Sequence, residues 1–168
     1  MTCDNLAACI KTNALLTMGY TWYIILRQPN PSDFIYYDTT YKNIGMPYTL
    51  FALKVSNGIV TDIRIMCSKA RIITEDTTMF AYPFSNVGTQ GGVCLGHNRI
   101  NYPLDTIYSI LNIPEMFLAM PNSEHNYGHN LSGLYYRDML KELEGKPFKE
   151  EWLTPNNMTF KSFIGTLR

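Results

Sequence analysis

Cys94 is the side chain of this sequence best suited to covalent chemistry, because a thiolate is a strong nucleophile even when little of the thiol is ionised. Four glycines lie within the nine positions 88–96 that surround it. Glycine weakens strands and helices through backbone entropy, so such a loop suits a backbone that approaches another group or leaves a side chain accessible. Asn86 stands eight positions earlier and carries an amide that can donate a hydrogen bond to a developing oxyanion.

Simpler interpretations of these residues also stand. Free cysteine is among the most buried residue types, so Cys94 fits equally well as a small apolar core residue. Asn86 taken alone is more often a turn former. We interpret the remaining cysteines, Cys3, Cys9 and Cys67, as structural. Their irregular spacing indicates free thiols in a reducing cytoplasm rather than a disulfide framework.

A zinc site is a hypothesis of a different class. Cys94 and His97 form a C-x2-H pair, while His125 and His129 form an H-x3-H pair, and such ligands can close a tetrahedral site. Metal bound at Cys94 would prevent thioester formation there, so the two ideas exclude each other. A papain-like protease is a further alternative; it needs a base and an orienting group, and no protease signature surrounds this cysteine.

The secondary structure that must position these residues begins with segments rich in aromatic and β-branched residues, which favour strands. The run YTWYIIL at 20–26 predicts a buried strand, and 34–37 looks like its antiparallel partner. Segments 48–55 and 59–67 flank an Asn-Gly pair at 57–58, which is the strongest short hairpin signal. The first hundred residues therefore predict an antiparallel meander of about four strands.

Beyond a loop rich in Gly, Pro and Asn, apolar residues recur at helical spacing. We predict helices over 104–111, 114–120, 133–144 with Gly145 at its C-cap, and 159–167. The order of sheet, loop and helices indicates one α+β domain whose helices cover one face of the sheet. We expect this domain to span 15–168 and the segment 1–14 to be helical or poorly ordered.

Composition narrows the classes of function. Lys plus Arg and Asp plus Glu number fourteen each, so the net charge is zero and nothing predicts nucleic-acid binding. No run of about 18 apolar residues is present, so we expect no membrane span. The start of the chain lacks the pattern of a secretory signal, which favours a cytoplasmic location.

The stretch YPFSNVGTQGGVCLG at 82–96 resembles the active-site region of the ubiquitin-conjugating fold, which carries His-Pro-Asn, a glycine and Cys-Leu at fixed distances. Asn86, Gly91 and Leu95 stand at that family's intervals from Cys94. With its flanks, the chain is similar to the prokaryotic ubiquitin-conjugating-like family D, which includes protein B of the PRTRC plasmid system.

The wider likeness includes FKEEWLTPNNMTFKSFI at 148–164, and the resemblance runs from about 15 to 164. One departure concerns the family's His and Pro, which are here Phe84 and Ser85. The bacterial branch commonly lacks this histidine, which mainly organises the loop, so the resemblance still implies conjugating activity.

The resemblance implies a bacterial transferase for conjugation of a ubiquitin-like protein, carried as a thioester on Cys94 and passed to an amine, with Asn86 supporting the oxyanion. The implied active-site loop comprises Phe84, Gly88, Gly91, Gly92, Leu95 and His97. Implied partners are a ThiF-like activating enzyme, a ubiquitin-like protein and a JAB-type deconjugating peptidase; no cofactor or metal is expected. The alternative is a non-catalytic binding module of the same shape.

Overall fold

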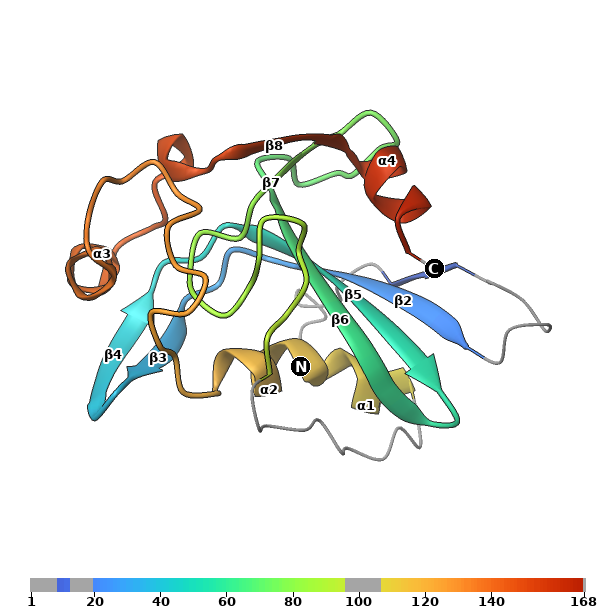
Figure 1. Cartoon of the computed structure of the whole chain (residues 1–168), viewed down its shortest axis with the longest axis horizontal. Coiled ribbons are helices and arrows are strands. Elements are labelled where there is room, and N and C mark those ends of the chain that lie inside the picture. The colour runs from blue at the N-terminus through green and yellow to red at the C-terminus, as the bar shows by residue number, and fades with distance from the viewer. Residues whose placement is uncertain (1–8, 13–19, 96–106, 168) are drawn as a thin grey trace, which may run out of the picture.

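The computed structural model describes residues 9–12, 20–95 and 107–167 and has a mixed α+β architecture, as the sequence predicts. Its main sheet has the order β1-β2-β5-β6-β7-β8, and all neighbouring strands are antiparallel (Figure 1). The strands are β1 (Cys9–Thr12), β2 (Thr21–Arg27), β5 (Tyr48–Ser56), β6 (Ile59–Ser68), β7 (Thr78–Phe80) and β8 (Pro155–Thr159).

The centre of the sheet consists of β2, β5 and β6, whose side chains are buried on both faces. Because side chains alternate along a strand, Ile25, Phe51 and Ile65 enter one core while Ile24, Leu50 and Met66 enter the other. This explains why the run 20–26 reads as continuously apolar. The predicted hairpin between β5 and β6 is confirmed, with both turn residues at positive φ, as a type I′ turn requires.

The strand predicted at 34–37 exists, but its predicted partner is wrong. β3 (Ser32–Tyr36) pairs with β4 (Thr39–Ile44) in a separate two-stranded sheet, and β2 pairs with β5 instead. Two polar contacts hold β4 in place: Asp33 accepts from the Asn43 N–H, and Glu144 accepts from the Lys42 N–H. After β2 the chain therefore leaves the main sheet rather than folding back beside β2.

The predicted helices are confirmed with shorter bounds within the described residues. They are α1 (Ile107–Leu111), α2 (Ile113–Leu118), α3 (Tyr136–Leu143) and α4 (Phe160–Gly165), with a 3₁₀ turn at Glu150–Trp152. Gly145 does not form a simple C-cap: α3 ends in a turn closed by the Lys146 N–H on the Leu143 carbonyl, with Glu144 extended and Gly145 at φ 68°.

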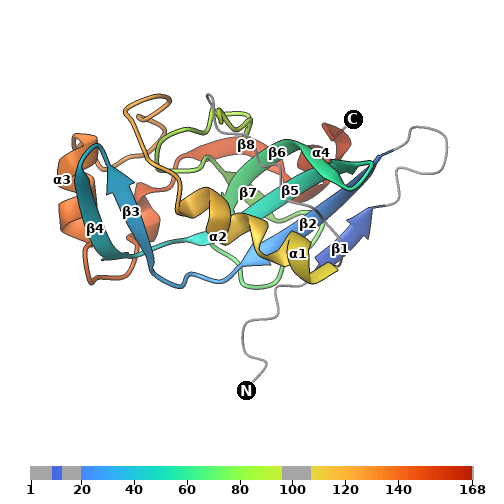
Figure 2. The ribbon, with the colours of Figure 1, turned by 90° about the horizontal axis from the view of Figure 1, so that it is seen from below.

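Helices cover both faces of the sheet, so the prediction of a single covered face is wrong. Figure 1 shows α1 and α2 on one side and α4 on the other, and Figure 2, seen from below, shows α1 and α2 in front of the strands. Phe163 of α4 belongs to the second core, whereas Phe117 of α2 and Leu140 of α3 belong to the first. Thr159 caps α4 by accepting from the Ser162 N–H.

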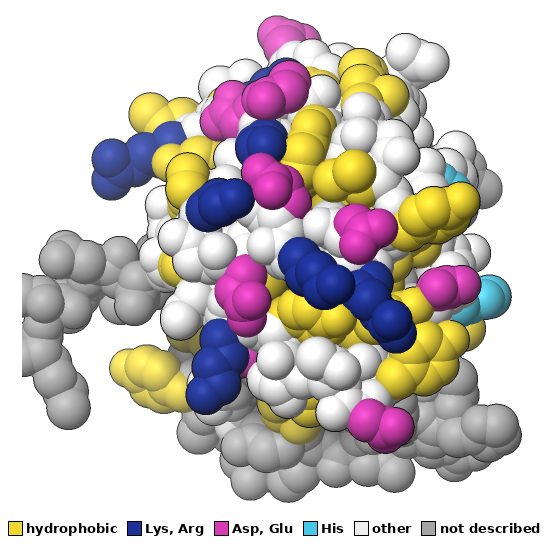
Figure 3. Space-filling view, turned by 90° about the vertical axis from the view of Figure 1, so that its left-hand side faces the viewer, with side chains coloured by type: hydrophobic (Ala, Val, Ile, Leu, Met, Phe, Trp, Pro, Cys, Tyr) yellow, Lys and Arg dark blue, Asp and Glu magenta, His cyan; other side chains and the backbone are white. Residues whose placement is uncertain are grey.

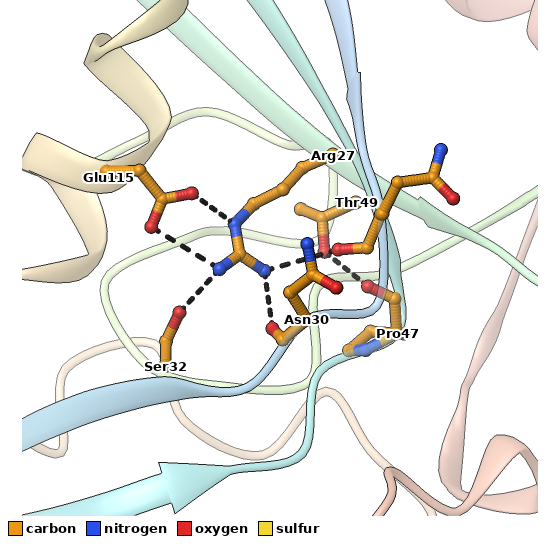
Figure 4. Close-up of polar contacts among 7 residues, drawn as sticks. Arg27, Asn30, Ser32, Pro47, Thr49 and Glu115 are labelled. Atoms are coloured by element: carbon orange, nitrogen blue, oxygen red, sulfur yellow. Dashed lines mark hydrogen bonds and ion pairs between the residues drawn. The ribbon is translucent and has the colours of Figure 1, made fainter. Parts of the chain in front are cut away.

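A buried arginine joins α2 to the sheet. Arg27, at the end of β2, donates to both carboxylate oxygens of Glu115, at 2.6 and 3.3 Å, and also to Ser32 and to the carbonyls of Gln28 and Asn30 (Figure 4). The Arg27 side chain is 8% exposed, so these contacts compensate for its desolvation.

The prediction of a helix in the segment 1–14 is wrong for residues 9–12, which are the part of it that the structure describes. Residues 9–12 form β1, which pairs with β2 along Cys9–Ile25 to Thr12–Trp22. The remainder of 1–14, and the part of the predicted helix at 104–106, lie outside the described residues. Among the helices that the structure describes, none is long and apolar enough to cross a membrane.

Candidate active site

The residues singled out by sequence lie in one loop, 81–95, here called the Cys94 loop. It leaves the sheet after β7 along an outgoing leg, 81–87, and comes back along a return leg, 88–95. The outgoing leg is buried throughout except at Asn86, which is half-buried. Its Phe84 is fully buried, with its ring centroid 4.8 Å from that of Phe34 and 5.4 Å from that of Tyr82.

The return leg is held by its backbone. Gly91 donates to the Gly88 carbonyl at 2.8 Å, which closes the turn, and its own carbonyl accepts from the Ile65 N–H at 2.8 Å. Val93 donates to the Ile63 carbonyl at 3.2 Å. The return leg thus pairs with the part of β6 that β7 leaves unpaired. Thr89 and Gln90 are exposed at the tip of the leg.

Gly91 is required at this point on two grounds. Its φ is +81°, which side chains with a Cβ rarely adopt, and a Cβ placed there would lie 2.9 Å from the Ile65 carbonyl oxygen. By contrast, a Cβ at Gly92 meets nothing within 4 Å, and one at Gly88 makes an ordinary contact. Of the glycines expected to admit a close backbone approach, Gly91 is therefore the one that the packing demands.

Cys94 ends the return leg as an exposed free thiol. Its N–H donates to the Asn86 carbonyl at 2.8 Å, so the two residues that sequence spacing paired are brought side by side across the two legs. Leu95 follows, half-buried against the first core. His97 lies outside the described residues.

Asn86 adopts a left-handed conformation, with φ 66°, and is fixed by the segment 121–125, which follows α2. Its N–H donates to the His125 carbonyl at 2.7 Å, and its side-chain amide donates to the Pro121 carbonyl at 3.4 Å. Ser123 donates to the side-chain oxygen at 3.3 Å. An amide nitrogen carries two hydrogens, so one can hold the loop while the other serves an oxyanion.

Sequence reasoning missed the segment 121–125 as part of this site. It lies about thirty positions beyond Cys94, and Ser and Asn residues in loops are too common to indicate a partner. The structure also shows it anchored elsewhere, because the Tyr36 hydroxyl donates to Glu124 at 2.6 Å. His125 contributes its backbone carbonyl, which any residue could supply, so its identity gave no signal for this contact.

The zinc hypothesis receives no geometric support from the residues that the structure describes. No three of their His, Cys, Asp and Glu side chains lie together as a metal site would require. His125 is exposed and His129 is half-buried, in a segment of turns rather than on one face of a helix.

The two cysteines whose side chains are described differ sharply in their surroundings. Cys67, near the end of β6, is completely buried, and burial raises the pKa of its thiol far above the ordinary value. Cys94 is exposed. Reactivity requires thiolate and access, so Cys94 is the one suited to chemistry, and the structural interpretation of Cys67 is consistent with its burial.

Charges of both signs are mixed on the face drawn in Figure 3, which carries α3 and the small sheet. Lys149 and Lys146 both contact Glu142, at 3.0 and 3.3 Å, and these two ammonium groups lower the pKa of that carboxyl. The charges of Lys146 and Lys149 are thus partly neutralised locally.

A hollow of about 460 Å³ lies beside the Arg27–Glu115 ion pair, away from the thiol. It is lined by Ile25, Arg27, Gln28, Asn30, Pro31, Leu111, Asn112, Pro114 and Glu115, all outside the Cys94 loop. The guanidinium that faces it already donates to protein acceptors from each of its nitrogens. The hollow therefore includes neither Cys94 nor Asn86.

Comparisons with family models, with curated proteins and with solved structures each found no match to this chain.

Proposed function

We propose that this chain carries a ubiquitin-like protein as a thioester on Cys94 and transfers it to an amine, as a member of the prokaryotic ubiquitin-conjugating-like family D. The observation that carries the proposal is the pairing of an exposed thiol with Asn86 across eight positions of sequence, through the bond from the Cys94 N–H to the Asn86 carbonyl. A buried thiol, or one distant from any amide donor, would have argued against it.

The layout of the domain supports the same proposal. An antiparallel sheet of β2, β5, β6 and β7 is followed by the loop that bears the cysteine and then by helices, which is the order implied by a ubiquitin-conjugating-like fold. Phe84, at the position of the family's histidine, packs in an aromatic cluster. Packing therefore organises the outgoing leg where the wider family would use a hydrogen-bonding ring.

The proposed reaction has two acyl transfers. The Cys94 thiolate attacks the thioester carbonyl that links the modifier's terminal glycine to a ThiF-like activating enzyme, forming one C–S bond as the enzyme's C–S bond breaks. An amine then attacks the new carbonyl, loses a proton to solvent or a base, and expels the Cys94 thiolate. A single aimed amide donor such as Asn86 contributes roughly 2.7–4 kcal/mol to stabilising the oxyanion of such a step.

The test incubates this chain with ATP and with the ThiF-like enzyme and ubiquitin-like protein encoded in the same gene neighbourhood. We expect an adduct that a thiol reductant removes. Cys94→Ser should give a reductant-resistant ester or no adduct. Cys67→Ala, which changes the other cysteine whose side chain is described, should retain the thiol-labile adduct.

Three outcomes would contradict the proposal. An adduct unaffected by Cys94→Ser would remove this cysteine from the mechanism. Tight binding of the activating enzyme or the modifier without any adduct would instead identify a non-catalytic binding module. Stoichiometric zinc in protein purified without added metal would favour the metal-stabilised alternative.

A further inference from the structure

A buried polar network lies directly beneath Asn86. Ser85 and Tyr136 are 0% and 2% exposed, and both hydroxyls reach the side-chain oxygen of Asn122, at 2.8 and 3.1 Å. The two hydroxyl oxygens are 3.3 Å apart. The network therefore joins the outgoing leg, the segment 121–125 and the start of α3.

The hydroxyls of Ser85 and Tyr136 and the side-chain oxygen of Asn122 form a triangle of hydrogen bonds, because the Ser85 hydroxyl also lies within donating distance of the Tyr136 hydroxyl. Each hydroxyl carries one proton, and the Asn122 oxygen has two lone pairs, so it accepts from both Ser85 and Tyr136. Burial raises the pKa of Tyr136 well above its ordinary value, which keeps its hydroxyl protonated and donating. Both bonds to Asn122 depend on its side-chain oxygen.

Asn122 is itself held in one orientation. Its side-chain nitrogen donates to the Met120 carbonyl at 3.1 Å, and its backbone N–H donates to the Ile35 carbonyl in β3 at 2.7 Å. The nitrogen cannot exchange places with the oxygen, because the oxygen would then face the Met120 carbonyl. The side-chain oxygen of Asn122 is therefore a fixed acceptor for the Ser85 hydroxyl, held in place by the bonds of Asn122 to Met120 and to Ile35 of β3.

We infer that Ser85, Asn122 and Tyr136 are positioning residues that set the place of Asn86 and, through it, of Cys94. Asn86 sits between the fully buried Ser85 and Val87, and its carbonyl receives the Cys94 N–H. The inference concerns the geometry of the loop, and its consequence for acyl transfer rests on the function proposed above.

The alternative is that the network only stabilises the fold. Removing one hydroxyl would then lower the free energy of unfolding without acting selectively on the Cys94 loop. The two interpretations differ in which backbone bonds open: a positioning role requires local loosening of the Asn86 and Cys94 amides.

The first test measures amide hydrogen exchange in the full chain. Tyr136→Phe removes the buried hydroxyl and keeps the ring. We expect the amides of Asn86 and Cys94, which donate to His125 and Asn86, to exchange about five- to tenfold faster. Tyr127→Phe is the matched control, because its hydroxyl donates instead to the Leu134 carbonyl at 2.6 Å. Unchanged exchange at both loop amides in the Tyr136 variant would overturn the inference.

The second test asks whether the network acts through Asn86. Cys94 is loaded with the modifier, and the rate of attack by a small amine is measured for the wild type, Tyr136→Phe, Asn86→Ala and the double variant. We expect the hydroxyl's removal to slow transfer about tenfold in the wild type and to have little further effect when Asn86 is Ala. Equal effects in both backgrounds would show that the hydroxyl does not set the position of the Asn86 side chain and would overturn that part of the inference.

The two tests separate the possible failures. Absence of any thioester in the wild type would reject the proposed function, while the exchange measurement still decides whether the network positions the loop. If Tyr136→Phe does not fold, Ser85→Ala removes the other hydroxyl donor to Asn122 and answers the same exchange question.

Discussion

The two legs of the Cys94 loop are held by different kinds of interaction. The outgoing leg depends on side chains: buried rings at Tyr82 and Phe84 and the polar contacts of Ser85 and Asn86. The return leg depends on backbone bonds to β6, with a glycine where the two chains approach most closely. The structure of the outgoing leg therefore depends on the identity of its residues, and that of the return leg depends on its backbone conformation.

The largest expected difference is between the alkylation rates of the two cysteines, Cys67 and Cys94. Cys67 of β6 lies opposite Phe80 of β7, in the core that Tyr82 and Phe84 of the outgoing leg also enter, whereas Cys94 is exposed near the end of the return leg. In a Cys3→Ser, Cys9→Ser background, we expect iodoacetamide to modify Cys94 at least about 100-fold faster than Cys67. Mass spectrometry of the alkylated peptides measures both rates, and denatured protein, where the rates should converge, is the control. Similar rates in the folded protein would show that the outgoing leg does not seal the core.

Phe84→Ala should show the side-chain dependence of the outgoing leg. Removing this completely buried ring leaves a cavity in the aromatic cluster and should lower the free energy of unfolding by about 3–5 kcal/mol. Denaturant unfolding measures the loss. Gln90→Ala at the exposed tip of the return leg is the comparison and should change stability by no more than about 0.5 kcal/mol. Equal losses would contradict the division between the legs.

These sites illustrate what the sequence could predict. The continuous apolar run of β2 and the Asn-Gly pair between β5 and β6 predicted strands correctly, because burial on both faces and a tight turn each leave a local pattern. The distance between Asn86 and Cys94 paired two residues that do meet. The partner of β3 and the role of Asn122 could not be found, since both depend on contacts between distant segments whose residues carry no local signal.

Gly91→Ala tests the backbone dependence of the return leg. The new Cβ would meet the Ile65 carbonyl and force an unfavourable φ, so we expect a loss of about 1–3 kcal/mol, measured by thermal or denaturant unfolding. Gly92→Ala is the neighbouring control, with open space for its Cβ, and should cost less than about 1 kcal/mol. The reverse order of the two losses would mean that the leg does not lie against β6 as described.

The smallest expected effect comes from a side chain of β8 that contacts the tip of the return leg. Asn156 of β8 donates to the Thr89 carbonyl at 2.7 Å. We expect Asn156→Ala to lower the free energy of unfolding by about 0.5–1.5 kcal/mol. Thr89→Ala keeps the carbonyl and should have almost no effect. A larger loss from the threonine change would show that the tip, too, relies on side-chain identity.

The exposed tip of the return leg has a practical consequence. Because Thr89 and Gln90 project from a backbone fixed on both sides, Gln90 is a suitable position for a covalently attached fluorophore, introduced as a non-natural amino acid so that Cys94 stays untouched. A dye there, four positions from the thiol, would report the arrival and departure of any bulky cargo as a change in emission, in real time and without quenching the reaction.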